Sequence, residues 1–111
     1  KAFGKNKERL LPLIYRWLES DEEYTVRFAI EMLMIHFLDD SFDERYPEKI
    51  SRIRSDKYYI NMMIAWYFAE ALAKQPKRIK PFISREYLSE DVYNKTLQKI
   101  RESSRTRNIK L

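Results

Sequence analysis

The fold is decided by residues 58–76, which read YYINMMIAWYFAEALAKQP. This stretch is rich in apolar and aromatic residues and contains no helix breaker before its final proline. We predict one long helix over residues 57–74. Ser55 or Asp56 is expected to cap it, because short polar side chains accept the free N–H groups at a helix start.

The same segment holds the middle copy of a weak internal repeat. Residues 27–30 read RFAI, residues 61–64 read NMMI and residues 94–97 read NKTL, at spacings of 34 and 33 residues. A repeat of this length is typical of helical pairs stacked into a solenoid. We therefore predict an all-α solenoid, whose long concave surface would bind an extended partner.

Apolar periodicity, prolines and acidic helix starts place further helices on both sides of the long one. Pro12 interrupts the first of them, so that helix either bends there or begins nearby. Ser89, followed by two acidic residues, is a good start for the last helix. We predict a single all-helical domain over residues 1–111. Its expected helices span about 5–19, 24–37, 47–54, 57–74, 76–83 and 90–103.

Composition excludes several functional classes. The chain has one glycine, no cysteine and one histidine, His36, so it lacks glycine-rich phosphate loops, disulfides and thiolate metal sites. We expect no metal, no cofactor and a cytoplasmic location, and we interpret His36 as structural. Asn61 and Glu70 interrupt the most apolar stretch, which is also too short to cross a membrane.

Charge is concentrated at the C-terminal end. Residues 1–73 carry 11 Lys/Arg and 13 Asp/Glu, whereas residues 74–111 carry 11 Lys/Arg and 4 Asp/Glu, a net charge of +7. A basic end beside a neutral body suggests a polyanionic partner, most simply nucleic acid. A solvated lysine-rich surface without a partner is the equally weighted alternative.

Four carboxylates in one loop have two interpretations. They are either an acid–base or cation site, or turn formers and helix caps between two helices. We favour the structural interpretation. The four residues are Asp39, Asp40, Asp43 and Glu44.

Two residues of the predicted helices are candidates for ligand contacts. Arg27, within an otherwise apolar helix, either pairs with Glu31 one turn later or reaches a phosphate from the concave face. Trp66 lies two turns after Tyr59, and most aromatic residues at such helical spacing belong to the core. The alternative is that Trp66 lines a groove and stacks on a base. Asn61 occupies the position of the middle repeat that matches Arg27.

The last predicted helix offers two pairs of cations, each with i,i+4 spacing. Lys95 lies one turn before Lys99, and Arg101 lies one turn before Arg105. Like charges stacked in this way repel, and a bridging anion would relieve the repulsion. We predict these four residues as a phosphate-binding set.

Three segments resemble the DNA alkylation repair proteins of the AlkD type. They are YYINMMIAWYFAEALAKQP at residue 58, SEDVYNKTLQKIRESSR at residue 89 and TVRFAIEML at residue 25. The resemblance covers most of the chain in the correct order. It implies a solenoid of HEAT-like repeats that binds double-stranded DNA and hydrolyses the N-glycosidic bond of alkylated purines such as 3-methyladenine and 7-methylguanine. It implies no cofactor, because the alkylated base is already a cationic leaving group.

The resemblance also assigns roles to individual residues. It places Arg27 at the DNA near the lesion, Trp66 in the lesion-facing groove, and Tyr58 and Tyr59 in the walls of the same cleft. Asn61 joins this DNA-contacting set. This chain has Ala69 where one branch of the family has an arginine. The phosphate contact of that arginine is therefore missing here.

The catalytic acid of the family is the largest departure. It would fall before Lys1, and it matches none of Asp21, Asp39, Asp40 or Asp43. We therefore expect this chain to be the C-terminal portion of a longer, monomeric protein, with no catalytic residue of its own. The alternatives are a non-enzymatic DNA-binding relative and a HEAT-like scaffold for another protein.

Overall fold

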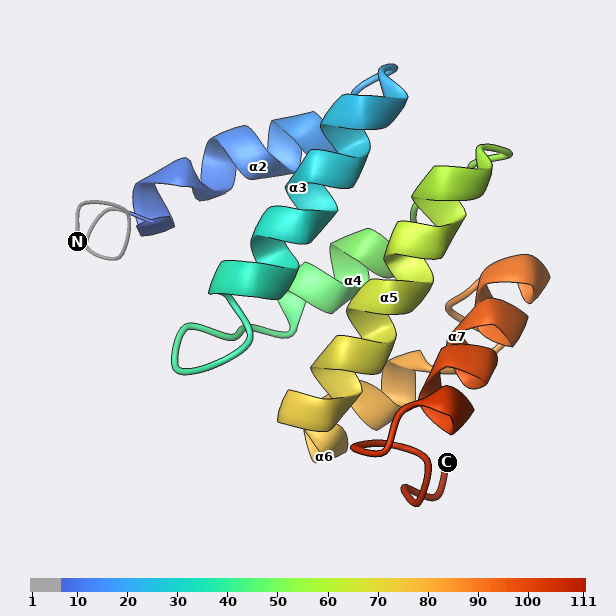
Figure 1. Ribbon diagram of the computed structural model, residues 1–111. Coiled ribbons are helices and arrows are strands. Elements are labelled where there is room, and N and C mark those ends of the chain that lie inside the picture. Colours follow the sequence, from blue (N-terminus) through green and yellow to red (C-terminus); the bar gives the residue numbers. More distant parts are fainter. Residues whose placement is uncertain (1–6) are drawn as a thin grey trace.

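Three long helices lie side by side along one face of the protein (Figure 1). They are α3 (Glu23–His36), α5 (Tyr58–Lys74) and α7 (Glu90–Glu102), and the computed structural model describes residues 7–111. Helix α5 is the central one and packs against both of the others. The face formed by these three helices is therefore the broadest regular surface of the protein.

Shorter elements cover the rest of the core. The 3₁₀ helix η1 (Lys7–Leu10) leads into α2 (Leu11–Leu18), which packs on α3. Behind α5 lie α4 (Arg45–Ser51), α6 (Pro76–Ile79) and the 3₁₀ helix η2 (Lys80–Phe82) (Figure 1). Residues 7–111 contain no strand, which confirms the all-α prediction. None of the helices described is both long and apolar enough to span a bilayer.

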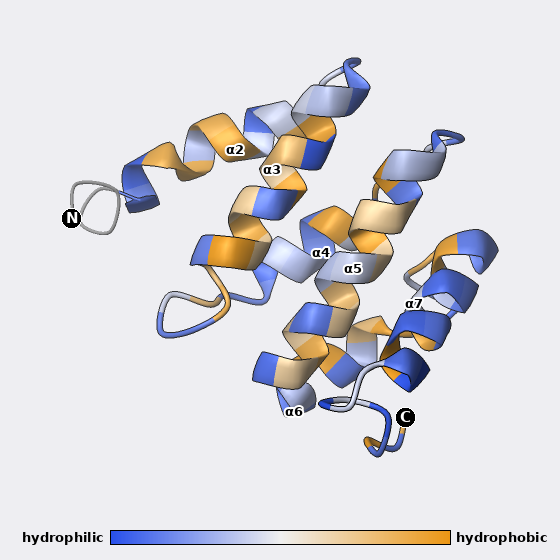
Figure 2. Cartoon of the chain, viewed as in Figure 1, coloured by the Kyte–Doolittle hydropathy of each residue, from blue (hydrophilic) through white to orange (hydrophobic). Residues whose placement is uncertain are grey.

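The core is built around α5, ten of whose 17 residues are buried. Hydrophobic residues follow most of its length, whereas α7 is largely hydrophilic (Figure 2). Tyr67, Phe68 and Leu72 are fully buried, and Phe37 packs edge to face on Tyr46 at 5.5 Å between ring centroids. The Cα radius of gyration is 13.4 Å, as expected for a compact chain of about 100 residues.

Local sequence signals account for most helix ends. The hydroxyl of Ser89 accepts the N–H of Val92 at 3.3 Å, so the predicted N-terminal cap of α7 is confirmed. Pro12 lies in the first turn of α2, where a missing N–H costs nothing, so that helix begins beside the proline. The predicted start at Lys5 lies outside the described residues.

The predicted cap of α5 is wrong. Lys57 is the N-terminal cap residue, and no side chain accepts a hydrogen bond there. The hydroxyl of Ser55 instead accepts the N–H of Lys57 at 3.0 Å, which forms a turn before the helix. Helix α4 also ends at Ser51, three residues before the predicted end.

Substitution of two aromatic residues of α5 should distinguish a core position from a surface position by the stability that is lost. Phe68→Ala empties a fully buried site and should lower the free energy of unfolding by about 3–5 kcal/mol. Trp66→Ala, at a side chain that is 52% exposed, should cost less than about 1 kcal/mol. Urea unfolding of both variants measures the difference. Equal losses would contradict the packing of α5.

Candidate functional site

Four side chains form a continuous row across α3, α5 and α7. The guanidinium of Arg27 lies 5.2 Å from the ring centroid of Tyr59, and Tyr59 meets Tyr58 edge to face at 5.1 Å. The ammonium of Lys95 lies 5.4 Å from the ring centroid of Tyr58. Both distances from cation to ring are within the range of cation–π attraction. We call these four residues the cation–tyrosine row.

The row is a surface feature rather than part of the core. Tyr58 and Tyr59 are each 58% exposed, and Arg27 and Lys95 are half-buried. An ammonium or guanidinium group attracted by one side of a ring keeps N–H donors on its outer side. The row therefore holds two positive charges in place at the surface, and one of them, Lys95, also pairs with Asp91.

The structure bears on one of the two predicted partners of Arg27, the carboxylate of Glu31. Within residues 7–111, no ion pair joins Arg27 to Glu31, although their spacing allows one. The arginine instead lies over the ring of Tyr59 on the neighbouring helix. The ion-pair interpretation of Arg27 is therefore wrong.

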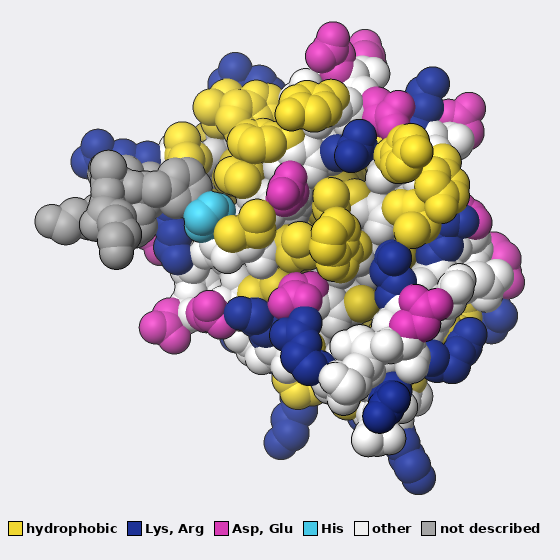
Figure 3. Space-filling view, viewed as in Figure 1, with side chains coloured by type: hydrophobic (Ala, Val, Ile, Leu, Met, Phe, Trp, Pro, Cys, Tyr) yellow, Lys and Arg dark blue, Asp and Glu magenta, His cyan; other side chains and the backbone are white. Residues whose placement is uncertain are grey.

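Trp66 extends this face along α5. It lies two helical turns after Tyr59 and is 52% exposed, so the core interpretation of Trp66 is wrong. Helix α3 also carries exposed apolar side chains, among them Tyr24, Phe28 and Ile35. Hydrophobic side chains accordingly gather over α3 and α5 on this face (Figure 3).

Asn61 does not join the row. Its side chain is buried, and its amide donates to the carbonyl of Ser55 at 2.9 Å and to the carboxylate of Asp91 at 3.5 Å. These contacts tie the start of α5 to the start of α7. Asn61 thus faces the interior of the helix packing rather than the surface.

Lys95 and Lys99 share one small groove, as their i,i+4 spacing predicts. Lys95 also donates to Asp91 at 2.8 Å, so a carboxylate of the protein relieves the repulsion that we expected an anion to relieve. Lys99 makes no ion pair within the described residues. The groove has a volume of about 180 Å³. Its lining residues are Tyr58, Met62, Lys95, Gln98, Lys99 and Glu102.

The predicted stacking of Arg101 on Arg105 is wrong. Helix α7 ends at Glu102, and the extended backbone of Ser103 turns the chain away. Arg105 then pairs with Glu70 of α5, whereas Arg101 stays exposed on α7. A contact between residues 35 positions apart leaves no local signal, so sequence spacing alone gave the wrong neighbour.

Three carboxylates of the acidic loop form ion pairs within the protein. Hydrogen bonds from Arg45 and Arg78 lower the pKa of Asp43 and Glu44, respectively. Within residues 7–111, no group of three or more His, Cys, Asp or Glu residues could hold a metal ion. The ion pairs of the loop are Asp43–Arg45 at 3.0 Å, Glu44–Arg78 at 2.6 Å and Asp39–Lys74 at 3.7 Å.

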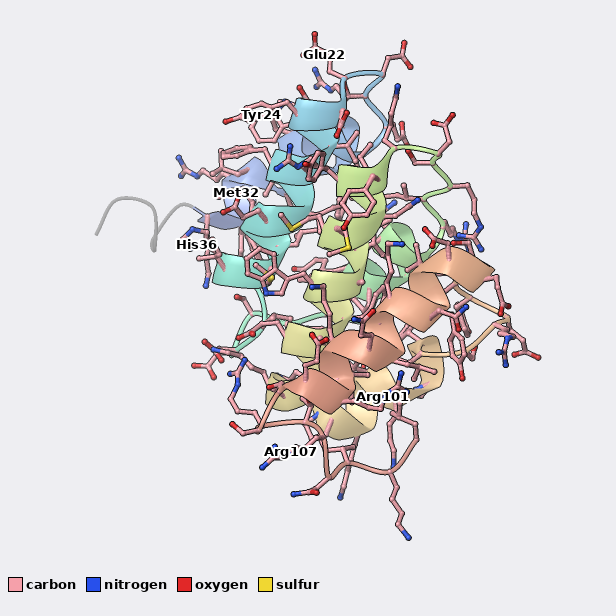
Figure 4. All side chains as sticks on the ribbon, turned by 45° about the vertical axis from the view of Figure 1, so that its right-hand side comes forward. Glu22, Tyr24, Met32, His36, Arg101 and Arg107 are labelled. Carbon is pink, nitrogen blue, oxygen red and sulfur yellow. The ribbon has the colours of Figure 1, made fainter. Side chains whose placement is uncertain are left out.

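His36 lies at the end of α3, away from the row (Figure 4). Its backbone carbonyl accepts hydrogen bonds from Lys7 at 2.9 Å and Ser41 at 3.3 Å. Burial, and then the charge of Lys7, lower the pKa of its imidazole. The neutral form is therefore favoured at neutral pH, in keeping with a structural role.

A larger cleft, of about 930 Å³, lies between the α2–α3 turn and the α4–α5 loop. Nothing in the sequence predicted it. Five carboxylates and five Lys or Arg residues line it, so it has no net preference for an ion of either sign. Arg54 there donates to the carbonyls of Ser51 and Tyr87, at 2.7 and 2.9 Å, and so braces the loop.

Comparison with known proteins identifies no relative of this chain. No protein-family model, no curated protein and no solved structure matches the chain. The resemblance to alkylation repair proteins therefore rests on the three sequence segments alone.

A double-mutant cycle tests the contact between Arg27 and Tyr59. Arg27→Gln combined with Tyr59→Ala should give a coupling energy of about 0.5–1 kcal/mol, as for an exposed cation–π pair. The matched cycle of Arg27→Gln with Glu31→Gln should give less than about 0.2 kcal/mol. Chemical unfolding supplies both values. A larger coupling energy for Arg27 with Glu31 than for Arg27 with Tyr59 would indicate that Arg27 pairs with Glu31 instead.

Proposed function

We propose that this chain binds duplex DNA across the face of α3, α5 and α7, and that the protein repairs alkylated DNA by releasing alkylated purines. The cation–tyrosine row is the observation that carries the proposal. It holds two half-buried cations and two exposed rings together across three helices. Cations that neutralise phosphates and rings that stack on bases are the two ingredients of nucleic-acid binding.

The spacing of the row suits a phosphate backbone. The three contacts of the row, at 5.2, 5.1 and 5.4 Å, place the charges of Arg27 and Lys95 no more than about 16 Å apart. Phosphates repeat every 3.4 Å along the axis of one DNA strand, so that separation covers at most about five nucleotides. Lys99 adds a further cation beside Lys95. Such contacts position DNA without reading its sequence.

Trp66 and Tyr59 suit a cationic base. Alkylation at N3 of adenine or N7 of guanine leaves the purine positively charged, and aromatic faces attract cations as well as stack on bases. Both side chains lie on the exposed stripe of α5 and are more than half exposed. We assign no catalytic residue in this chain, because none of its aspartates matches the acid that the resemblance requires.

We also propose that the chain is built from HEAT-like units, of which α2 with α3 and α4 with α5 form two helical pairs and α7 is the last long helix. The matching positions Arg27, Asn61 and Asn94 fall on three successive long helices. Two of these residues contact the next long helix, although through different chemistry. Arg27 of α3 lies over the ring of Tyr59 on α5, and Asn61 of α5 donates a hydrogen bond to Asp91 of α7. Matching positions that each contact the next long helix support a structural repeat.

A protein-binding scaffold is the second candidate. The observation that favours it is the exposure of apolar side chains on α3, with Tyr24 at 74%, Ile35 at 53% and Phe28 at 39%. Such residues can anchor a protein partner. Ionic strength separates the two functions, because only phosphate binding releases counterions and weakens steeply with salt.

DNA binding should depend on the row and on salt. The affinity for a methylated duplex, measured by fluorescence anisotropy, should fall by at least about tenfold between 50 and 200 mM salt. Lys95→Gln should weaken binding and make the salt dependence shallower. Lys49→Gln is the matched control, since Lys49 lies 4.6 Å from the ring centroid of Tyr15 outside the row. Salt-independent binding, or equal effects of the two variants, would support the scaffold instead.

Base release should require the exposed face. In the full-length protein, Arg27→Ala and Trp66→Ala should each slow the release of 7-methylguanine from alkylated duplex DNA by about 10-fold or more, since removing about 1.4 kcal/mol of transition-state stabilisation slows a reaction tenfold. Trp17→Ala, at the other tryptophan, serves as the control. Unchanged release in both face variants would refute the assignment of this surface.

A further inference from the structure

The ion pairs of the C-terminal half leave a distinct set of cations unmatched. Of the 11 Lys and Arg residues in 74–111, five pair with carboxylates. Within the described residues, the other six make no ion pair. The pairs are Lys74–Asp39, Arg78–Glu44, Arg85–Glu90, Lys95–Asp91 and Arg105–Glu70. The unmatched cations are Lys77, Lys80, Lys99, Arg101, Arg107 and Lys110.

Four of the unmatched cations belong to one end of the protein. Lys77 is in α6, Lys80 begins η2, and Arg107 and Lys110 are in the C-terminal tail, and all four are exposed. Helix α6 and the tail lie at the same end (Figure 1), from which Lys and Arg side chains project (Figure 3). Figure 4 places Arg107 there, beyond the end of α7. We call these four residues the basic end.

The tail that carries two of these cations is held against the fold. The buried hydroxyl of Thr106 donates to the carbonyl of Ile100 at 2.8 Å, and Ile109 packs against the core. The N–H of Arg107 donates to the carbonyl of Ser103 at 2.9 Å. The backbone that carries Arg107 and Lys110 is thus held against the fold, at the same end of the protein as α6 (Figure 1).

We propose that the basic end is a second phosphate-binding surface, which extends the DNA contact beyond the face of α3, α5 and α7. This inference rests on the proposed function. Clustered cations without carboxylate partners repel one another, and a phosphodiester backbone relieves that repulsion by replacing condensed counterions. The basic end carries none of the exposed rings of the cation–tyrosine row. It therefore contributes affinity without preference for a lesion or a sequence.

The salt dependence of DNA binding tests the basic end. In the variant Lys77→Gln/Lys80→Gln/Arg107→Gln/Lys110→Gln, the slope of log affinity against log salt should become shallower by about 3.6, or about 0.9 for each phosphate that the variant no longer neutralises. The affinities for alkylated and unmodified duplexes should fall by the same factor. The control is Arg9→Gln/Arg16→Gln/Lys49→Gln/Arg52→Gln, which removes four exposed cations from η1, α2, α4 and the residue after α4. Of these, Arg52 pairs with Glu48. Circular dichroism establishes that both variants are folded.

The possible results separate this inference from the proposed function. A shallower slope in the basic-end variant, with the control close to wild type, supports the second surface. If wild type binds the duplex but both variants change the slope equally, or neither does, the basic end is not a phosphate surface and the proposed function stands. If wild type binds no duplex, the proposed function fails as well. Binding to phosphatidylserine vesicles but not to duplex would overturn both in favour of a membrane surface.

Discussion

The burial of α5 on nearly all sides is the constraint on which the rest of the structure depends. A helix this apolar is stable in water only when neighbours cover it, and α3, α4, α6 and α7 together do so. Each large side chain that it buries contributes on the order of 1.5–3 kcal/mol. One narrow stripe of α5 stays open, between α3 and α7. It carries Tyr59 and Trp66, and Tyr58 lies at its edge.

That stripe explains why the candidate site has its particular chemistry. The rings come from the central helix, and the cations come from the two helices that flank it. Helix packing, rather than attraction to the rings, therefore places Arg27 beside Tyr59 and Lys95 beside Tyr58. Because cation–π contacts on an exposed surface are weak, the row is a consequence of the fold and adds little to its stability. Its value lies in holding charge and aromatic surface side by side, which suits a ligand that has both phosphates and bases.

Sequence reasoning predicted what depends on neighbours in the chain and missed what depends on packing. The helices and the cap at Ser89 follow from spacings of a few residues, and the structure confirms them. The contacts of Arg27 with Tyr59 and of Arg105 with Glu70 join residues 32 and 35 positions apart, and no local pattern indicates them. Helical periodicity identified the stripe containing Trp66 but not its exposure. A stripe of aromatic residues looks the same whether a neighbouring helix covers it or leaves it open.

The most direct test of the account is an NMR titration of this chain with alkylated duplex DNA, observing its two tryptophan indole N–H signals. Trp66 is half exposed on the proposed DNA-binding face, whereas Trp17 on α2 packs edge to face on Phe28 at 5.6 Å. We expect the Trp66 signal to shift as DNA is added and the Trp17 signal to stay in place. A shift of Trp17 alone, or of neither signal at low salt, would contradict DNA binding by the face of α3, α5 and α7.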